Sequence, residues 1–248
     1  MIITVTNQKG GIAKTTTAAA LATAWKREGY KVLLIDLDFQ STLTFNLIAE
    51  NPENLQPTIL DVLEGKAAAK DAIIRTEQAD IIPANEHLSS FTDKGQERAL
   101  KDGLADITEL YDFIIIDTAP TLSTLYICAL TASDRVVIPA QADTANLHAL
   151  EQLSRTIDTV KRLSNPDIKV AGIVLTRYDH RKVLNREIAE VIKDAAAAAG
   201  TRLYDTTIRE CIAIAEAQAL KQDIYTYAPK SNAAKDYKQL SAEIKAHL

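Results

Sequence analysis

A short loop near the start of the chain has the residue types that bind a phosphate chain. It lies between an expected strand at residues 2–6 and an expected helix at about residues 15–28, and it reads Lys9-Gly10-Gly11-Ile12-Ala13-Lys14-Thr15-Thr16. Glycines let the backbone turn its amides inward, and the following helix presents free amides and a positive dipole end to phosphate oxygens. A Gly-Gly turn with two surface lysines is the alternative, but the strand–loop–helix context favours a nucleotide loop.

The polar side chains of this loop have separate expected roles. Lys14 is placed to neutralise the β- and γ-phosphates, and the Thr15 hydroxyl to bind Mg²⁺. Thr16 follows where a second hydroxyl can touch the α-phosphate. The loop is therefore expected to bind a magnesium–nucleotide complex.

Three carboxylates lie at or just beyond the ends of expected strands. Asp36 and Asp38 follow the apolar run 31–35, and Asp117 ends the apolar run 113–116. In a parallel sheet, strand ends of this kind point their side chains at the ligand. An apolar run that ends in Asp is the Walker B pattern, so Asp117 is expected to reach Mg²⁺ directly or through water. Acids at strand ends also cap the next helix, and this alternative stays open for Asp36 and Asp38.

Strand and helix patterns alternate along the whole chain. Continuous apolar runs at 81–82, 135–138 and 170–175 add further strands, and such runs are typical of a parallel sheet that is covered on both faces. Segments with helical periodicity separate them, and no internal repeat or break in composition is present. We expect one doubly wound α/β domain, mostly parallel and flanked by helices, at residues 1–248.

Composition excludes several classes of protein. The chain has 248 residues and a net charge of −5, so a wholly basic nucleic-acid binder is excluded but a local basic patch is not. Its two cysteines, Cys128 and Cys211, and its scattered histidines have no zinc-ligand spacing, and we expect core or near-core thiols in a reducing cytoplasm. The start of the chain lacks the features of an export signal, and no apolar run approaches the roughly 20 residues that span a bilayer.

The phosphate loop resembles the deviant Walker A group, whose pattern is KGGxxKT followed by Ser or Thr. This group of P-loop ATPases includes ParA, MinD and the nitrogenase iron protein. Its hallmark is a second lysine at the start of the loop, which Lys9 matches. The resemblance implies that Lys9 crosses a dimer interface to the partner's ATP, as an arginine finger does. Ala13 stands where the family commonly has glycine, and we expect its methyl group to be tolerated but positive φ to be disfavoured there.

The carboxylates also match motifs of this family. The run Asp36-Leu37-Asp38-Phe39-Gln40 resembles the D-x-D-P-Q switch, with Phe39 in place of proline. The match implies that Asp38 positions the attacking water and that Asp36 supports the Mg²⁺ shell. The segment that starts at Asp117 resembles the D-x-P-P turn, with one proline missing.

The resemblance extends over nearly the whole chain. Segments 59–63, 82–85, 137–141 and 230–237 follow the ParA pattern, and Thr176-Arg177 resembles the segment that flanks the nucleotide base. The usual I-P-R-N-x-R segment begins here as Ile208-Arg209, without its proline and without the basic residue expected at Ala213. The base contacts implied by the resemblance are therefore Thr176, Arg177, Ile208 and Arg209.

Among the members of this group, the chain resembles the short ParA proteins that have no N-terminal DNA-binding domain. The segment 235–248 has Tyr237, Leu240 and Ile244 on one face, and we expect a helix packed on the domain rather than a MinD-like membrane anchor. Paired cysteines of the nitrogenase type and the substrate loop of related ligases are not found. The resemblance implies slow Mg-ATP hydrolysis, an ATP-dependent homodimer and a ParB-like adaptor, in the cytoplasm and on the nucleoid. A positioning ATPase at a membrane or on another cargo is the alternative.

Non-specific DNA binding requires a local basic surface on this acidic chain. The candidates are two clusters, Arg177, Arg181, Lys182 and Arg186 around a helix start, and Lys230, Lys235 and Lys238 in the C-terminal region. Two solvated helix faces are the alternative, because acidic residues lie nearby: Glu187, Glu190, Asp194 and Asp236. A dimer would double the phosphate contacts of one monomer, so ATP would control DNA affinity without base readout.

Overall fold

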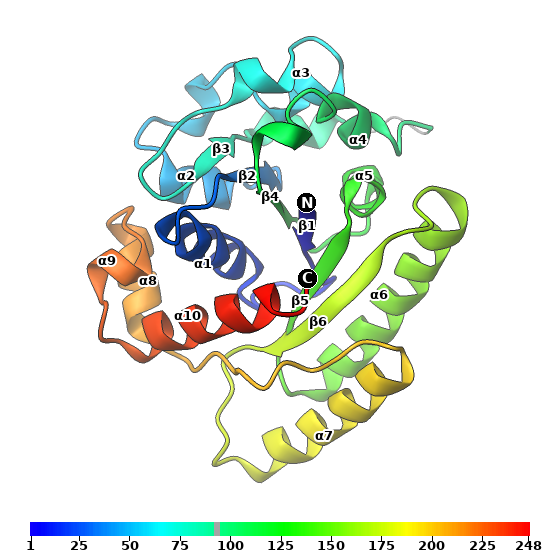
Figure 1. Cartoon of the computed structure of the whole chain (residues 1–248), viewed down its shortest axis with the longest axis vertical. Coiled ribbons are helices and arrows are strands. Elements are labelled where there is room, and N and C mark those ends of the chain that lie inside the picture. The colour runs from blue at the N-terminus through cyan, green and yellow to red at the C-terminus, as the bar shows by residue number, and fades with distance from the viewer. Residues whose placement is uncertain (92–94) are drawn as a thin grey trace.

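The fold is built on one six-stranded sheet, which we describe from a computed structural model that covers residues 1–91 and 95–248. The strands are β1 (Ile2–Val5), β2 (Val32–Leu37), β3 (Asp80–Ile82), β4 (Phe113–Thr118), β5 (Arg135–Ala140) and β6 (Lys169–Leu175). Their order in the sheet is β3-β2-β4-β1-β5-β6, and every neighbouring pair is parallel. The predicted doubly wound α/β fold is confirmed (Figure 1).

Helices cover both faces of the sheet, as the continuous apolar strands require. One face carries α1 (Lys14–Arg27) and α10 (Asn232–Lys245). The other face carries α3 (Ile59–Leu63), α4 (Ala99–Gly103), α5 (Thr124–Ala132), α6 (Thr144–Leu163) and α7 (Val183–Ala198). Three short helices, α2 (Thr42–Leu47), α8 (Ile212–Ala219) and α9 (Ile224–Tyr227), lie beside α1 and α10 at the edge of the molecule (Figure 1).

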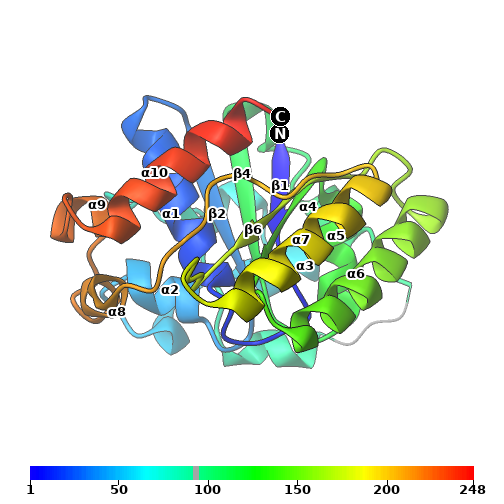
Figure 2. The ribbon, with the colours of Figure 1, turned by 90° about the horizontal axis from the view of Figure 1, so that it is seen from below.

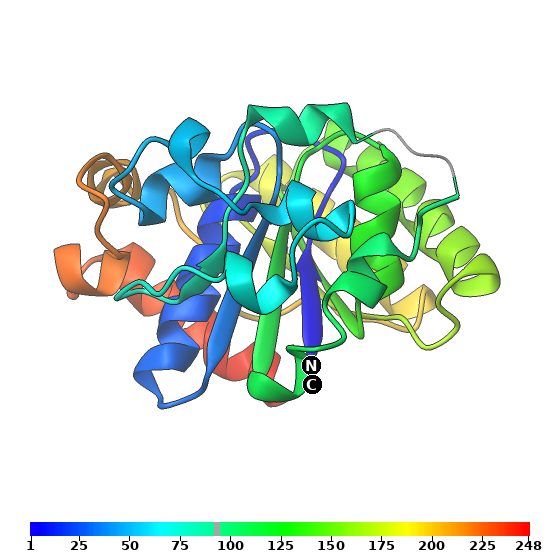
Figure 3. The same ribbon diagram turned by 90° about the horizontal axis from the view of Figure 1, so that it is seen from above.

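The C-terminal helix packs on the domain, as the sequence predicts, and its neighbour there is α1. Tyr237, Leu240 and Ile244 are all 0% exposed. The Trp25 indole donates to the Ser241 carbonyl oxygen at 3.2 Å, which ties α1 to α10. As a result the end of α10 lies near the start of β1, and the two chain termini are neighbours (Figures 2 and 3).

The sheet extends on both sides of β1, and this strand order determines which loops form the ligand pocket. From β1 the sheet continues through β4 and β2 on one side and through β5 and β6 on the other. The loops that follow β1, β2, β4 and β6 therefore meet at the carboxyl edge of the sheet, where open α/β sheets bind their ligands.

Candidate nucleotide site

A pocket of about 830 Å³ lies at the carboxyl edge of the sheet, and it collects almost all of the predicted nucleotide-binding residues. Its lining includes Gly10, Gly11, Ile12, Ala13, Lys14, Thr15, Thr16, Asp38, Thr176, Arg177, Ile208 and Arg209. These residues come from loops far apart in the sequence. The volume falls within the range of about 300–1,000 Å³ that is typical of small-molecule sites.

The phosphate loop delivers free backbone amides to this pocket. Ala13 is the residue before α1, and its carbonyl oxygen accepts the first helical bond, from the Thr17 amide at 2.9 Å. No side chain caps this helix start, so its first amides remain available to an anion. Ala13 has φ 65° and ψ 31°, so our expectation that this position avoids positive φ is wrong. The left-handed conformation costs an alanine about 1–2 kcal/mol, and strain of this kind is found at ligand sites.

Lys14 lies almost fully buried at the base of the loop. Its amino group donates to the Lys9 carbonyl oxygen at 2.8 Å, and the residue is 7% exposed. Burial lowers the pKa of Lys14, while the carboxylates of Asp117 and Asp38 oppose this shift. The ammonium group is therefore held in the pocket beside two acids, where it can pair with a phosphate.

Asp117 is a buried carboxylate without a partner. It is 1% exposed, and neither side-chain oxygen has a hydrogen-bond partner among the described residues. Burial and the neighbouring Asp36 raise the pKa of Asp117 well above its usual value, and Thr15 and Lys14 only partly oppose this. A buried charge of this kind is costly unless it is paired. A divalent cation beside Thr15 would satisfy it, so the donor set fits Mg²⁺.

Asp36 makes the helix-capping contacts that were the alternative to a metal role. Its carboxylate accepts from the Thr44 amide at 2.8 Å, the Thr44 hydroxyl at 2.7 Å and the Asp38 amide at 3.2 Å. Burial raises its pKa to about 6, although these donors oppose the shift. Asp36 is 0% exposed and is not part of the pocket lining, whereas half-buried Asp38 lines the pocket. A role for Asp36 in the Mg²⁺ shell stays a prediction.

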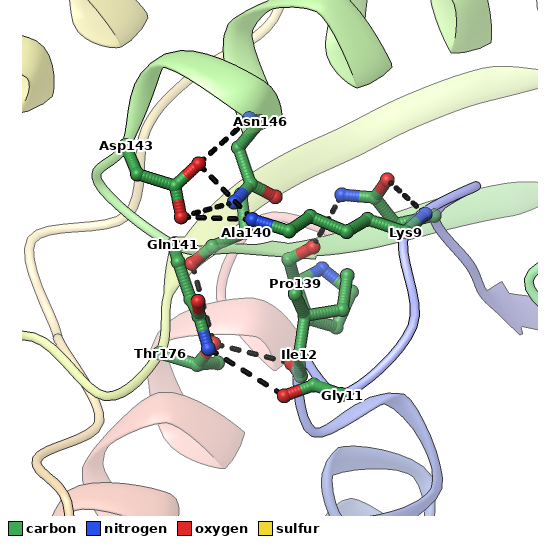
Figure 4. Close-up of polar contacts among 10 residues, drawn as sticks. Lys9, Gly11, Ile12, Pro139, Ala140, Gln141, Asp143, Asn146 and Thr176 are labelled. Atoms are coloured by element: carbon green, nitrogen blue, oxygen red, sulfur yellow. Dashed lines mark hydrogen bonds and ion pairs between the residues drawn. The ribbon is translucent and has the colours of Figure 1, made fainter.

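Lys9 does not line the pocket, because its side chain is held elsewhere on the same chain. Its amino group donates to both carboxylate oxygens of Asp143, at 3.1 and 2.9 Å (Figure 4). Asp143 also caps α6, where it accepts from the Asn146 backbone amide at 2.9 Å. Burial raises the pKa of Asp143, but the Lys9 and Asn146 donors outweigh it and the net shift is downward. Both partners of the pair are about one-third exposed, at 31% and 39%.

Two side chains that follow neighbouring strands, Gln141 after β5 and Thr176 after β6, brace the phosphate loop. The Thr176 hydroxyl donates to the Ile12 carbonyl oxygen at 3.1 Å, and the Gln141 amide reaches the Gly11 carbonyl oxygen at 3.5 Å (Figure 4). Thr176 therefore has a bracing contact with the loop in addition to its place in the pocket wall. The predicted role of Thr176 at the nucleotide base stays a prediction.

The two segments that were expected to flank the base lie side by side. Thr176 and Ile208 form a parallel β-bridge. Arg177 follows at φ 50°, an unusual conformation for a residue with a side chain. The Arg209 guanidinium is held in a bidentate pair by Asp236, at 3.0 and 2.6 Å, so its side chain is already engaged although the residue lines the pocket.

The predicted DNA-binding residues have different surroundings. Arg181 is paired with Asp179 at 2.9 Å, and Arg186 donates to the His180 carbonyl oxygen at 2.8 Å. The remaining cluster members are exposed, and among the described residues none of them forms an ion pair: Arg177, Lys182, Lys230, Lys235 and Lys238. Asp236 is one of the acidic residues expected to reduce the positive charge of the second cluster. Its side chain instead pairs with Arg209, and the residue is only 7% exposed.

Several pocket residues were not predicted from the sequence. They include Gln40, Thr42, Glu210, Cys211, Ile212 and Gln218. Gln218 donates to the Thr16 hydroxyl at 3.2 Å, a contact between α8 and the phosphate loop that no local pattern reveals. Cys128 is buried as expected, and half-buried Cys211 lies in the pocket wall. Across residues 1–91 and 95–248, no cluster of three or more His, Cys, Asp or Glu side chains is placed to hold a metal ion. Such a cluster is not required for Mg²⁺ bound with a nucleotide, because phosphate oxygens and water supply most of its ligands.

Comparisons with known proteins agree with this geometry. The AAA domain family matches residues 1–170. The chain is 35% identical over 252 residues to the chromosome partitioning protein ParA of Caulobacter vibrioides, covering 98% of this chain and 93% of that protein. It is 36% identical over 253 residues to the sporulation initiation inhibitor protein Soj of Bacillus subtilis, covering 99% and 98%. The chain belongs to the ParA family of P-loop ATPases.

Solved structures of similar chains include nucleotide complexes. A structure of cobyrinic acid a,c-diamide synthase from Mycobacterium smegmatis with bound ADP and magnesium aligns with a TM-score of 0.83 at 32% identity, covering 99% of this chain and 94% of that one. Apo McdA of Cyanothece aligns with a TM-score of 0.87 at 23% identity, covering 99% and 98%, and this match supports the fold alone. Within the described part of the chain, no helix has the length and apolar character that crossing a membrane requires.

Proposed function

We propose that this ParA-family chain is an ATP-dependent dimerisation switch that works in DNA partition. The observation that carries the proposal is the arrangement at the phosphate loop. The magnesium–nucleotide site is built from free amides, buried Lys14 and the unpartnered Asp117, and the second lysine of the loop, Lys9, does not line this pocket. Because Lys9 does not contact the pocket of its own chain, its side chain is available to the nucleotide of a partner chain.

The proposed roles follow from position. Lys14 and the amides of residues 10–16 would bind the phosphates, and Thr15 with Asp117 would hold Mg²⁺, which would supply charge neutralisation at the phosphates. Asp38, half-buried in the pocket wall, positions the attacking water. Lys9 of the second copy supplies the cation that completes the site, so hydrolysis by one chain alone is slow.

The wider assignment is supported by the named relatives and by the exposed basic residues. Partition requires contact with DNA and with an adaptor of the ParB kind, and Lys235 and Lys238 on α10 supply exposed charge of the right sign. We treat residues 1–248 as one ATPase domain, acting in the cytoplasm on the nucleoid. A dimer presents two such surfaces, so its DNA affinity and its salt dependence exceed those of the monomer.

The central test combines two variants with sedimentation velocity in Mg-ATP and Mg-ADP. The wild type is expected to dimerise in ATP and remain monomeric in ADP. Lys14→Ala is expected to lose nucleotide binding, whereas Lys9→Ala is expected to bind ATP and remain monomeric. An equally strong dimer in both nucleotides would refute the switch, and ATP affinity retained in Lys14→Ala would refute the site.

Two other functions have one observation each in their favour. The solved structure at 32% identity is that of a diamide synthase, so ATP-dependent amide synthesis is one candidate. ATP hydrolysis that requires no amine acceptor would exclude it. The amphipathic tail favours a membrane-positioning ATPase, but the apolar face of α10 is buried against α1. Flotation with liposomes in ATP would support the membrane role, and its absence together with DNA binding would exclude it.

A further inference from the structure

A second hollow lies between helices α6 and α7, away from the nucleotide pocket. Both helices pack on the same face of the sheet, and between them is a groove of about 730 Å³ with strands β5 and β6 as its floor. No residue lines both the groove and the nucleotide pocket. The groove includes Arg135 and Lys169, the first residues of their strands, so it extends to the amino edge of the sheet.

Apolar side chains from both helices remain accessible to water in this groove. Leu147 and Leu150 of α6 are half-buried, and Val191 of α7 is 51% exposed. Buried Ile157 and Ile192 continue the apolar surface down to the floor. Because burial of apolar area is favourable, the groove can gain free energy by covering these side chains with an apolar ligand.

The charges at the rim favour an anionic ligand. The lining contains five basic residues, Arg135, Arg155, Lys161, Lys169 and Arg202, and two acidic residues, Glu151 and Asp158. The balance of five positive and two negative charges is +3, in a chain whose net charge is −5. Among the described residues, none of these five cations forms an ion pair with an acidic side chain, although Arg135 donates to the Leu248 main-chain oxygen at 3.5 Å. Positive potential is thus concentrated where apolar surface is exposed.

The shape of the groove selects among anionic ligands. Its wall on α6 runs from Leu147 to Lys161, which is about 21 Å of helix, or roughly four turns. A strand is disfavoured as ligand because the outer edge of β6 is already occupied: the Ile173 amide donates to the Arg202 carbonyl oxygen at 2.8 Å. A helix needs no backbone partner, and it can insert its apolar face between α6 and α7.

We propose that the groove between α6 and α7 binds an amphipathic α-helix of a partner protein, with apolar anchors in the groove and acidic side chains facing the basic rim. Anchors spaced three and four residues apart would lie against Leu150 and Val191. Acidic residues beside them would pair with Arg155, Lys161, Lys169 and Arg202. The site is independent of nucleotide.

A labelled peptide tests the proposal directly. The probe is a fluorescein-labelled helix of about 15 residues with leucines on one face and glutamates beside them, which matches the length of the groove. Saturable binding to the full chain is expected by fluorescence anisotropy at low salt, with or without ATP. Two control peptides keep the composition but scramble the leucine spacing, or keep the leucines and replace every glutamate with lysine. Both are expected to bind at least tenfold more weakly.

Matched protein variants locate the binding. Val191→Asp and the double change Arg155→Glu with Lys161→Glu are expected to weaken the probe at least tenfold, while Lys193→Glu, which lies outside the groove on α7, is not. All four positions are exposed, so unchanged circular dichroism is expected for each variant. Failure of the probe to saturate, equal binding of the lysine peptide, or an unaffected Val191→Asp variant would overturn the proposal. The proposal would also be contradicted if anionic vesicles bound instead of the peptide probe and if the same substitutions weakened that binding.

Discussion

The ion pair between Lys9 and Asp143 makes a quantitative prediction about dimerisation. If Lys9 must reach the nucleotide of a second copy, each chain has to break this pair before the dimer forms. The change Asp143→Asn removes the charge but keeps a side chain that caps helices as well as Asp does. The start of α6 is therefore preserved while the hold on Lys9 is weakened, and the ATP-bound dimer should become more stable.

The size of the effect follows from the exposure of the pair. The Lys9 and Asp143 side chains are 31% and 39% exposed, so water and salt screen their attraction. Ion pairs of this kind contribute about 0.2–1 kcal/mol. A dimer releases two of them, which gives roughly 0.4–2 kcal/mol and a dimer dissociation constant lower by roughly 2- to 30-fold. The gain should shrink as the salt concentration rises.

Sedimentation velocity with Mg²⁺ and a slowly hydrolysed ATP analogue measures this constant. The matched control is Asp102→Asn, which removes a more exposed ion pair with Arg98 and should leave dimerisation unchanged. A wild type that never dimerises in ATP would refute the proposed switch itself. A wild-type dimer that Asp143→Asn leaves unchanged would refute only the reasoning about the ion pair. A weakened dimer would refute it too and would place Asp143 within the dimer contact.

Three further predictions concern the phosphate loop, the buried carboxylate and the basic surface of α10. Ala13→Gly should raise the free energy of unfolding, measured by urea denaturation, by roughly 0–1.6 kcal/mol. The change relieves about 1–2 kcal/mol of backbone strain, and the greater freedom of glycine in the unfolded chain costs about 0.4–1 kcal/mol of that gain. Clear destabilisation would contradict this reasoning. The pKa of Asp117 is raised in the fold, so without ligand the stability should fall as pH rises from its unfolded value through its folded value. Asp117→Asn should reduce this dependence to the part that Asp36 contributes, because the pKa of Asp36 is also raised, to about 6. The change should also raise the apo melting temperature at neutral pH by an amount equivalent to about 1–3 kcal/mol and abolish the Mg²⁺ effect on nucleotide binding. Lys235→Ala with Lys238→Ala should weaken DNA binding more than Arg181→Ala does, because Asp179 already pairs with Arg181; an equal loss in filter binding would count against it.

The sequence predicts the parts of this structure that depend on local patterns. Apolar runs mark the strands, and the run of glycine and lysine between a strand and a helix places the phosphate loop. Because parallel strands end at one edge, the same patterns also predict that Asp38 and the loop share a pocket. The order of the strands, in contrast, depends on which apolar faces pack together, and no local pattern states it.

The details that the sequence could not predict are contacts between distant residues. Lys9 and Asp143 are 134 positions apart, and Arg209 and Asp236 are 27 apart. Each pair forms only after folding has brought two distant segments together: the phosphate loop and the start of α6 in the first, the segment before α8 and helix α10 in the second. The conformation of Ala13 was missed for a different reason: intrinsic preference disfavours positive φ, but the chain turns at this residue, with φ 65°, as the phosphate loop enters α1.

The two lysines of the phosphate loop are connected, which links nucleotide binding to the availability of Lys9. The Lys14 ammonium donates to the backbone carbonyl oxygen of Lys9, so each lysine in this structure has a partner on the same chain. A nucleotide phosphate would compete for Lys14, since pairing with a full charge is stronger than a bond to a carbonyl oxygen. The backbone of Lys9 would then lose one of its restraints, while Asp143 would still hold the side chain. In the proposed switch, ATP binding would therefore remove one backbone restraint on Lys9, and the nucleotide of the second copy would still have to displace Asp143 from its side chain.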